Sequence, residues 1–253
     1  MSILDFDHVT FRYPGDPQDT LEHLSFQVQP GAFHCLLGVS GCGKSTIFRL
    51  INGLLRPDAG EIRVGGENIT GLRQYCGYMP QKDLLFPWRS VGRNLALPLE
   101  IRGGLSGTEI RNRVREALAS VGLEGCIDKK PEELSGGMRQ RAAFARTMLT
   151  GSNLLLLDEP FSALDYLTRI DMQEWLRAQW QGSGKTILFI THDVEEALYL
   201  SSDILVVTDT PIRELSRIPV PLPGSRTRRD LSRPEIVELR EALLAALRKQ
   251  VIT

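Results

Sequence analysis

The sequence predicts an α/β fold with a mainly parallel sheet, an N-terminal antiparallel β layer and a helical insertion. Short apolar runs at 154–157, 186–190 and 204–207 are typical of parallel strands that are covered on both faces. Segments 3–13 and 21–28 alternate apolar and polar residues on either side of a turn, which indicates an antiparallel strand pair. Strand signals become sparse over about residues 84–150, where helical spacing replaces them.

The helical insertion is predicted over about residues 84–150. Within it, segments 108–121 and 137–149 carry apolar residues at helical spacing. We therefore expect one α/β domain over residues 1–211, with the helical part inserted in it, and a C-terminal tail over residues 212–253.

The tail is rich in proline after Thr210, then basic, and ends in a predicted helix over residues 234–249. The apolar residues of that helix fall on one face, namely Ile236, Leu239, Leu243 and Leu247. Packing against the domain is the expected role of this face, with a lid or a contact between two copies as the alternatives.

The composition indicates a cytoplasmic protein with one sizeable core. The chain has 253 residues, of which 42% are hydrophobic, and its 30 Lys and Arg against 31 Asp and Glu give a net charge of -1. Because this balance lacks the basic excess of nucleic-acid-binding proteins, we expect no nucleic-acid partner. The four cysteines show no CxxC spacing, which argues against a disulfide framework or a zinc site. No stretch approaches the roughly 18 apolar residues of a spanning helix, and the first residues do not resemble a signal peptide.

A phosphate-binding loop is predicted where the sequence reads GVSGCGKS at 38–45, between an apolar strand at 33–37 and a helical pattern at 47–54. The match is to the P-loop of nucleoside triphosphatases, in which glycines let backbone N–H groups and a helix N-terminus surround the phosphates. Lys44 is expected to neutralise the β- and γ-phosphates, and Ser45 to bind Mg²⁺. A simple glycine-rich turn would not need the whole pattern in this context. The residues assigned to nucleotide binding are Gly38, Ser40, Gly41, Cys42, Gly43, Lys44, Ser45 and Thr46.

Two adjacent carboxylates follow the apolar run at 154–157, at the predicted carboxyl end of a parallel strand, where ligands of open α/β sheets bind. We expect Asp158 to hold Mg²⁺ through its outer coordination sphere and Glu159 to polarise the water that attacks the γ-phosphate. His192, in FITHD after the next apolar strand, is expected to reach the same phosphate. Without the P-loop, capping of a strand end would be the simpler interpretation of such an acidic pair.

The segment LSGGMRQR at 134–141 resembles the signature of the ABC ATPase superfamily. Ser135 suits a helix N-cap, while Gly136 and Gly137 expose the first N–H groups of the following helix to an anion. The resemblance implies a head-to-tail homodimer, in which this segment of one chain closes over the γ-phosphate of ATP bound to the other. Met138 replaces the commoner glutamine of the signature.

Three further residues match the superfamily in order along the chain. The resemblance implies that Tyr13 stacks on adenine, with an ordinary strand aromatic as the alternative. Gln81 in YMPQKD resembles the glutamine that senses Mg²⁺ at the catalytic site and links it to the membrane subunit. Asp165 in SALD resembles the aspartate that couples the two protomers at the nucleotide sites. The similarity extends over about residues 3–211.

Two longer segments, LLFPWRSVGRNLALPLEIRG and FSALDYLTR, are similar to the importers of nitrate, taurine and aliphatic sulfonates. This branch more often has glycine where Ser162 stands. The resemblance implies an ATP-hydrolysing subunit on the inner face of the cell membrane, with separate transmembrane permease subunits and, indirectly, an extracytoplasmic solute-binding protein as partners. Phe86, Pro87 and Trp88 are expected to form a partly exposed apolar partner site or else to pack locally.

Some ABC ATPases act on macromolecular partners instead of driving transport, and several features bear on this alternative. Chromosome and repair types place a long coiled coil between the P-loop and the signature, and the residues between Lys44 and Ser135 leave no room for one. Translation factors carry two cassettes in one chain, whereas each motif occurs once here. A regulatory module without catalysis would be expected to lack Glu159 or His192, and both are present. These features favour an importer ATPase. A non-transport ABC ATPase that acts on another macromolecular partner is the alternative.

Overall fold

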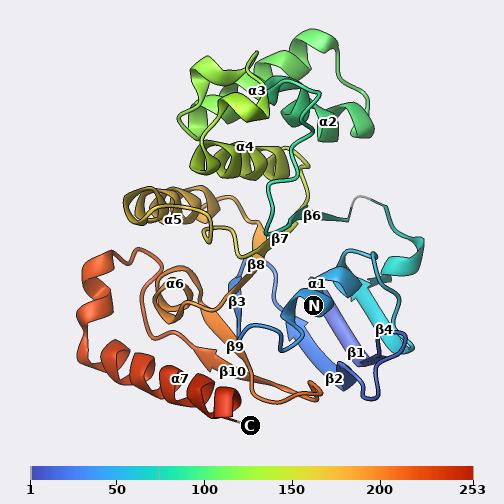
Figure 1. Cartoon of the computed structure of the whole chain (residues 1–253), viewed down its shortest axis with the longest axis vertical. Helices are drawn as coiled ribbons and strands as arrows, with labels where there is room; N and C mark the ends of the chain where they lie inside the picture. Colours follow the sequence, from blue (N-terminus) through green and yellow to red (C-terminus); the bar gives the residue numbers. More distant parts are fainter. Residues whose placement is uncertain (1, 74, 253) are drawn as a thin grey trace.

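A six-stranded sheet with mostly parallel neighbours forms the centre of the molecule (Figure 1). The computed structural model describes residues 2–73 and 75–252, so the ends of the predicted domain and tail, Met1 and Thr253, lie outside the described residues. The strand order is β10-β9-β3-β8-β7-β6, in which only β10 is antiparallel to its neighbour. These strands are β3 (Phe33–Leu37), β6 (Cys76–Met79), β7 (Leu154–Asp158), β8 (Thr186–Thr191), β9 (Asp203–Val207) and β10 (Leu215–Pro219).

The central strands are buried on both faces, which explains their unbroken apolar runs. In β7, Leu154 and Leu156 pack towards the second sheet of the molecule, whereas Leu155 and Leu157 pack in the core that contains the helices of the insertion. The runs predicted as strands at 154–157, 186–190 and 204–207 are confirmed as β7, β8 and β9.

The second sheet is antiparallel and has the order β2-β1-β4-β5. The strands β1 and β2 confirm the antiparallel pair predicted from the alternating segments 3–13 and 21–28. Alternate residues of β1, such as Leu4, Phe6 and Val9, point into the core between the two sheets. The four strands are β1 (Leu4–Phe11), β2 (Leu21–Val28), β4 (Ala59–Val64) and β5 (Glu67–Asn68).

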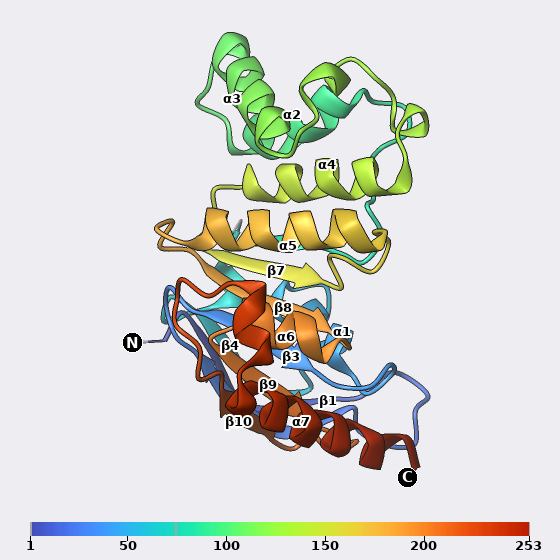
Figure 2. The ribbon, with the colours of Figure 1, turned by 90° about the vertical axis from the view of Figure 1, so that its left-hand side faces the viewer.

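Three helices, α2, α3 and α4, form a lobe that rises above the main sheet in Figures 1 and 2. This lobe corresponds to the predicted helical insertion, and it meets the sheet through α5, where Phe144 and Trp175 pack edge to face with ring centroids 4.9 Å apart. The helices are α1 (Lys44–Ile51), α2 (Val91–Arg102), α3 (Gly107–Ser120), α4 (Gly136–Met148), α5 (Tyr166–Trp180), α6 (Val194–Leu200) and α7 (Pro234–Ile252). Short 3₁₀ helices are η1 (Ile69–Gly71), η2 (Glu124–Cys126), η3 (Pro131–Glu133) and η4 (Arg228–Ser232).

Over residues 2–73 and 75–252, no helix is both long and apolar enough to cross a membrane.

Helix α1 lies between the two sheets and starts three residues earlier than its apolar pattern indicated. It begins at Lys44, because Gly43 acts as its N-cap with a left-handed φ of 103°. The predicted end at Leu54 is wrong: the helix ends at Ile51, Gly53 takes a left-handed φ of 74°, and the Leu54 side chain is 69% exposed.

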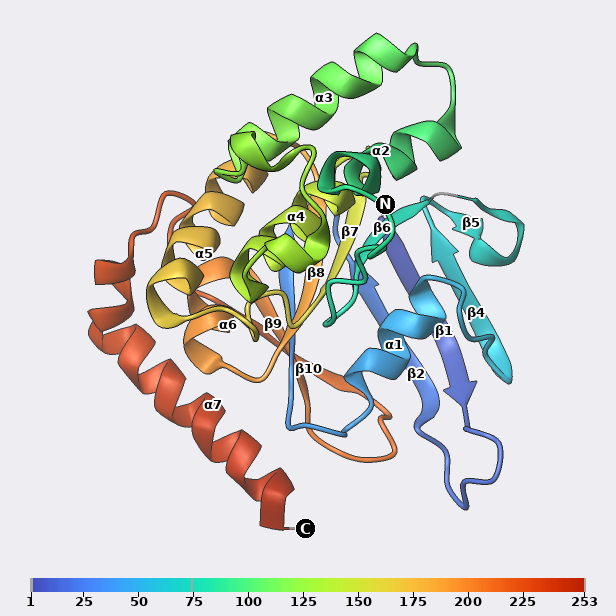
Figure 3. The same cartoon turned by 45° about the horizontal axis from the view of Figure 1, so that its top comes forward.

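The tail packs onto the domain. Helix α7 lies along the side of the molecule away from α1 (Figure 3), and the expected packing of its apolar face is confirmed because Ile236, Leu243 and Leu247 are buried. The proline-rich segment before it contains β10, a strand that the sequence did not predict, and it also bridges to the second sheet through Leu21 and Ile212.

Candidate functional site

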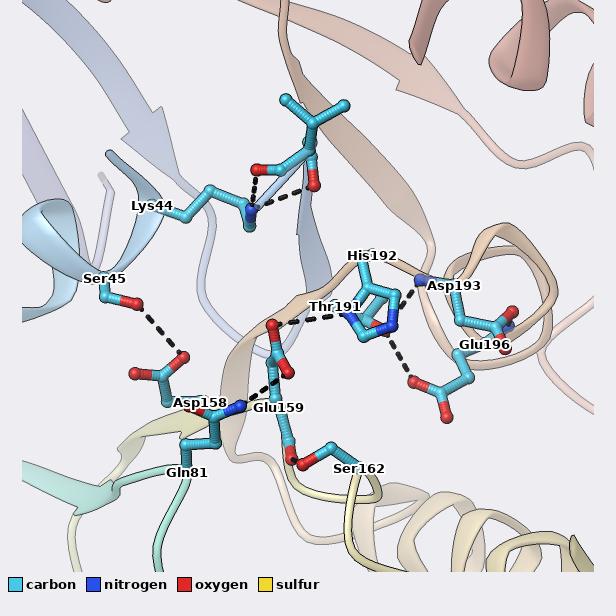
Figure 4. A network of polar contacts seen from close by, with 12 residues as sticks. Lys44, Ser45, Gln81, Asp158, Glu159, Ser162, Thr191, His192, Asp193 and Glu196 are labelled. Carbon is cyan, nitrogen blue, oxygen red and sulfur yellow. Dashed lines mark hydrogen bonds and ion pairs between the residues drawn. The ribbon is translucent and has the colours of Figure 1, made fainter. Parts of the chain in front are cut away.

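The P-loop connects β3 to α1 at the carboxyl end of the main sheet (Figure 4). Gly41 and Gly43 have φ of 83° and 103°, values that would strain any residue with a side chain, so the curvature of the loop depends on them. The Lys44 side chain is buried, and its Nζ donates to the backbone oxygens of Gly38 at 2.9 Å and Val39 at 2.6 Å. The lysine ammonium therefore lies inside the loop, where a phosphate-binding cation is required.

A hollow of about 540 Å³ opens beside the P-loop. It is lined by residues 39–42 of the loop and by residues 208–210, which follow β9. This volume lies within the usual range for small-molecule sites. Cys42 is buried, with its Sγ 3.7 Å from Lys44 Nζ, so it is a small residue of the loop wall.

Asp158, the last residue of β7, lies opposite Ser45, the second residue of α1. The Ser45 hydroxyl lies 3.5 Å from Asp158 Oδ1, and the Tyr78 hydroxyl lies 3.5 Å from Oδ2. Burial raises the pKa of Asp158, and the charge of the adjacent Glu159 raises it further. The structure thus brings Ser45 and Asp158, two of the three residues predicted for the metal site, together, while Gln81 contacts Glu159 instead.

Glu159 lies at the centre of the polar network in Figure 4. Its φ of 45° is left-handed, which is uncommon for a residue other than glycine. One carboxylate oxygen accepts a 2.9 Å hydrogen bond from Gln81 Nε2, and the other lies 3.4 Å from His192 Nδ1. The backbone oxygen of Glu159 accepts hydrogen bonds from the N–H and hydroxyl of Ser162, which hold the turn after β7. The three residues predicted to be catalytic, Gln81, Glu159 and His192, therefore meet.

Tyr13 contacts the start of α1. Its hydroxyl lies 3.1 Å from the Thr46 hydroxyl and accepts a 3.3 Å hydrogen bond from Arg49, while the ring packs edge to face on Phe11. The ring is half-buried beside the P-loop helix, so one part of it stays accessible to a ligand.

The signature residues lie on a different lobe from the P-loop (Figure 1). Ser135 is the N-cap of α4, and its hydroxyl accepts a hydrogen bond from the Met138 N–H at 3.2 Å. Ser135 and Gly136 are exposed, whereas Met138 packs against the core. The structure confirms the predicted cap but does not bring Ser135, Gly136 and Gly137 to the P-loop of the same chain.

Asp165 lies directly before helix α5. It is the N-cap of α5, where its carboxylate accepts a 3.0 Å hydrogen bond from the Thr168 N–H, and hydrogen bonding by Thr168 lowers the pKa of this carboxyl.

Among the predicted apolar surface residues, Trp88 is 69% exposed and stacks on the half-buried Phe86 with ring centroids 5.0 Å apart.

The sequence did not single out several polar residues of this region. Tyr78 contacts Asp158, and residues 208–210 complete the hollow. Thr191 and Glu196 hydrogen bond to each other beside His192. Tyr78 lies three residues before Gln81, and Glu196 four after His192, so proximity to a predicted site residue was the only signal available in the sequence.

A strand, a P-loop and a helix, with two carboxylates and a histidine after the neighbouring parallel strands, define a P-loop nucleoside triphosphatase. The chain belongs to the ABC transporter family, whose profile matches residues 21–162, and it is an ABC-type ATPase.

Curated relatives are similar over most of the chain. The formylaminopyrimidine import ATP-binding protein ThiZ of Halalkalibacterium halodurans is 42% identical over 219 residues, which are 87% of this chain and 85% of the relative. The taurine import ATP-binding protein TauB of Chromobacterium violaceum is 40% identical over 258 aligned positions, which cover 99% of this chain and 98% of the relative. The nitrate import ATP-binding protein NrtC of Synechococcus elongatus is 40% identical across 98% of this chain, which corresponds to 38% of NrtC.

Solved structures share the same fold. The ATP-binding cassette MJ0796, described as dimeric in a post-hydrolysis state with ADP and Pi, has a TM-score of 0.77 and 28% identity, covering 86% of this chain and 98% of the cassette. CbiO1 from Clostridium perfringens, part of the ABC transporter complex CbiONQ, has a TM-score of 0.76 and 25% identity, covering 96% of this chain and 95% of CbiO1. The predicted fold class, a P-loop core with an antiparallel β layer and a helical signature subdomain, is confirmed.

Proposed function

We propose that this chain binds ATP with Mg²⁺ at the P-loop and hydrolyses it to power solute import through separate membrane subunits. One observation carries the proposal: Lys44, the pair Asp158 and Glu159, and His192 converge at one edge of the main sheet because they follow the neighbouring strands β3, β7 and β8. A buried cation, two carboxylates and an imidazole are the groups that phosphoryl transfer to water requires.

The P-loop holds the phosphates of ATP. On binding, the Lys44 ammonium exchanges the backbone oxygens of Gly38 and Val39 for oxygens of the β- and γ-phosphates, which form stronger, charge-assisted hydrogen bonds. The loop N–H groups and the N-terminus of α1 complete the anion site. Tyr13 stacks on adenine, and its hydroxyl contact with Thr46 holds the ring next to the loop.

The oxygen donors of Ser45, Asp158 and Gln81 fit Mg²⁺, which prefers oxygen ligands and binds to proteins through few carboxylates. Because Gln81 Nε2 donates to Glu159, the amide oxygen of Gln81 is the atom left for the cation. The paired oxygens of Ser45 and Asp158 lie on the P-loop side of the same site. Bound Mg²⁺ supplies positive charge that offsets the negative charge of the phosphate oxygens.

Glu159 is the proposed general base. Its two carboxylate oxygens are oriented by Gln81 and His192, and the turn after β7 fixes its backbone, so the carboxylate can accept a proton from a water molecule facing the γ-phosphate. His192, whose side chain is 58% exposed, contacts the γ-phosphate.

The active unit is a head-to-tail homodimer in this proposal. Ser135, Gly136 and Gly137 of one chain would close over the γ-phosphate at the P-loop of the other, and Asp165 would couple the two sites. Two observations support it: the exposed N-terminus of α4 lies on a separate lobe from the P-loop, and the similar cassette MJ0796 is dimeric.

The proposed role in import follows from the relatives named for taurine, nitrate and formylaminopyrimidine import. In this role residues 1–211 form the ATPase domain with its helical subdomain at 84–150, and 212–253 form its tail. The chain would lie on the inner face of the cell membrane against permease subunits, which receive solute from an extracytoplasmic binding protein. The exposed Trp88, which stacks on the half-buried Phe86, supports an apolar contact with those subunits. The solute would be nitrate, taurine, a sulfonate or a related small molecule.

The replacement Glu159→Gln tests the proposal. The amide keeps the size of the side chain but cannot accept the proton, so kcat should fall by about 100-fold or more while ATP still binds. ATP and Mg²⁺ should then trap a dimer, which light scattering detects. The matched control is Glu214→Gln, an exposed glutamate outside the site, which should behave as wild type. Wild-type turnover of Glu159→Gln would exclude Glu159 as the base, and a variant that binds ATP yet stays monomeric would contradict the dimer.

A further inference from the structure

Glu196 has no role in the hydrolysis proposed above, yet it is buried next to the site. It lies in the first turn of α6, and its carboxylate accepts hydrogen bonds from the Thr191 hydroxyl at 2.7 Å and from Gln173 Nε2 at 2.9 Å. The residue is 7% exposed, and this burial raises the pKa of Glu196. A buried acid with two directed donors is a costly arrangement unless each bond is kept.

The bonds of Glu196 act on the backbone that carries His192 (Figure 4). Thr191 is the last residue of β8, and its hydroxyl oxygen also accepts a 3.0 Å hydrogen bond from the Asp193 N–H. Thr191 and Asp193 flank His192. The Thr191 hydroxyl belongs to the residue before His192 and bonds the N–H of the residue after it, so it holds the backbone on both sides of the histidine. Because the imidazole itself is largely exposed, its position depends on this backbone more than on packing.

Gln173 extends the hydrogen bonds away from the site. It lies on α5 with 2% of its surface exposed, and its amide oxygen accepts a hydrogen bond from Arg228 Nη2. A guanidinium only donates and a carboxylate only accepts, so the amide between Arg228 and Glu196 has a single orientation that satisfies both. The direction of each hydrogen bond in the series is therefore fixed.

Arg228 belongs to the C-terminal segment, in η4. Its guanidinium carbon lies 4.7 Å from the centroid of the Tyr199 ring, and its Nε lies 3.6 Å from a carboxylate oxygen of Glu174. These contacts hold the guanidinium against α5 and α6, from which it reaches Gln173. Residues far apart in the sequence thus form one series: Arg228, Gln173, Glu196 and Thr191.

We propose that Arg228, Gln173 and Glu196 are positioning residues for His192, and that the C-terminal segment takes part in ATP hydrolysis through them. The inference rests on the proposed role of His192. It assigns the tail a function in addition to packing, because Arg228 orients the amide that orients the carboxylate beside the histidine.

The main test compares Arg228→Met with Arg229→Met in the full-length chain. Both changes remove one positive charge from η4, but the Arg229 side chain is exposed and lies outside the series. Methionine at 228 keeps an extended side chain over Tyr199 and removes the donor to Gln173, so kcat should fall by about tenfold. The KM for ATP should change by less than about twofold, since the P-loop is intact. Arg229→Met should keep the wild-type kcat.

A double-variant comparison separates positioning from a general loss of structure. In a His192→Ala background there is no imidazole to position, so adding Arg228→Met should leave the residual rate unchanged. An equal fractional loss in both backgrounds would overturn the inference, as would a wild-type kcat for Arg228→Met. If His192→Ala itself retains full activity, the proposed role of His192 fails instead, and the two failures are thereby distinguished.

A more conservative variant and thermal melting separate a loss of positioning from a loss of folding. Arg228→Lys keeps the charge and one donor, so its kcat should lie between those of wild type and Arg228→Met. Thermal melting of each variant, followed by circular dichroism, identifies the folded chains. A folded Arg228→Lys with a lower kcat than a folded Arg228→Met would contradict the proposed series.

Discussion

His34 in β3 is a fully buried histidine with an unusual environment. Neither of its ring nitrogens has a hydrogen-bond partner within residues 2–73 and 75–252, and the nearest carboxylate oxygen, from Asp203, lies 4.0 Å from Nδ1. Burial lowers the pKa of His34 to about 4, and Asp203 opposes the shift only in part. The folded protein therefore keeps this imidazole neutral at pH values where the unfolded chain protonates it.

This difference predicts an acid sensitivity of the fold. Between about pH 6.5 and pH 4 the unfolded chain binds a proton at His34 that the folded chain does not. The contribution of His34 to the free energy of unfolding should therefore fall by about 3 kcal/mol as the pH drops, and this contribution should level off below pH 4. Urea denaturation of wild type and His34→Leu across this range measures it. The difference between the two chains should change with pH; parallel curves would show that His34 does not titrate in this way.

Residues whose chemistry depends on local sequence were predictable. The P-loop, Asp158 and Glu159, and His192 each follow a recognisable strand, so both their identity and their meeting point could be inferred. The contact between Gln81 and Glu159 joins residues 78 positions apart and was not predicted, because the family resemblance gave Gln81 a role but no partner. The contacts of Tyr78 and Glu196 depend on how distant elements pack, and no short sequence pattern encodes that packing.

At the scale of elements, buried parallel strands were predicted well and exposed or irregular elements were not. Strand β10 (LSRIP) is an edge strand with no fully buried residue and a proline at its end, so it gave neither an apolar run nor a regular alternation. Helix α2 contains Pro98, whose local preference is to break a helix, and yet it continues from Val91 to Arg102. The tertiary contacts of both elements outweigh their weak local preference.

Arg226 attaches the C-terminal segment to α6. From its contacts we predict how much this segment contributes to the free energy of unfolding. Its guanidinium is buried and donates to the backbone oxygens of Leu198 and Ser201 at 2.8 and 2.9 Å, at the end of α6. Burial lowers its pKa to about 10, so the group stays charged at neutral pH. Arg226→Met should lower the free energy of unfolding by about 2 kcal/mol, because carbonyl groups at the end of α6 lose a charged donor.

Equilibrium denaturation measures this loss, and limited proteolysis locates it. Cleavage around residues 223–233 should become faster in Arg226→Met, since the segment loses its attachment to α6. Arg229→Met again serves as the control, because that exposed arginine removes the same charge without the same contacts. Equal stability of the two variants would show that the buried hydrogen bonds of Arg226 contribute nothing net.

At the scale of the whole molecule, the separation of signature and P-loop predicts that two inactive chains can restore each other. A Ser135→Arg chain carries a bulky cation at the signature, and a Glu159→Gln chain lacks the proposed base. In their mixed dimer one site contains both changes and the other contains none, provided that each site takes its signature from the partner. A covalently linked mixed dimer should therefore regain up to about half of the wild-type ATPase activity.

Linked dimers of each single variant are the controls and should both be inactive. A site-specific crosslink from position 135 of one chain to position 40 of the other, formed only with nucleotide, gives a readout that does not depend on turnover. If the mixed dimer binds nucleotide, stays inactive and does not form the crosslink, sites shared between chains are excluded.

The central place of β3 also sets the order in which the protein can assemble during synthesis. This strand is complete at residue 37, but its hydrogen-bonding neighbours β8 and β9 are complete only at residues 191 and 207. A ribosome needs on the order of ten seconds to make the chain between the end of β3 and the end of β9. During this time the P-loop of the growing chain has no neighbouring strands to support it. We therefore expect the chain to become competent to bind nucleotide only late in translation, after both neighbours of β3 have been made.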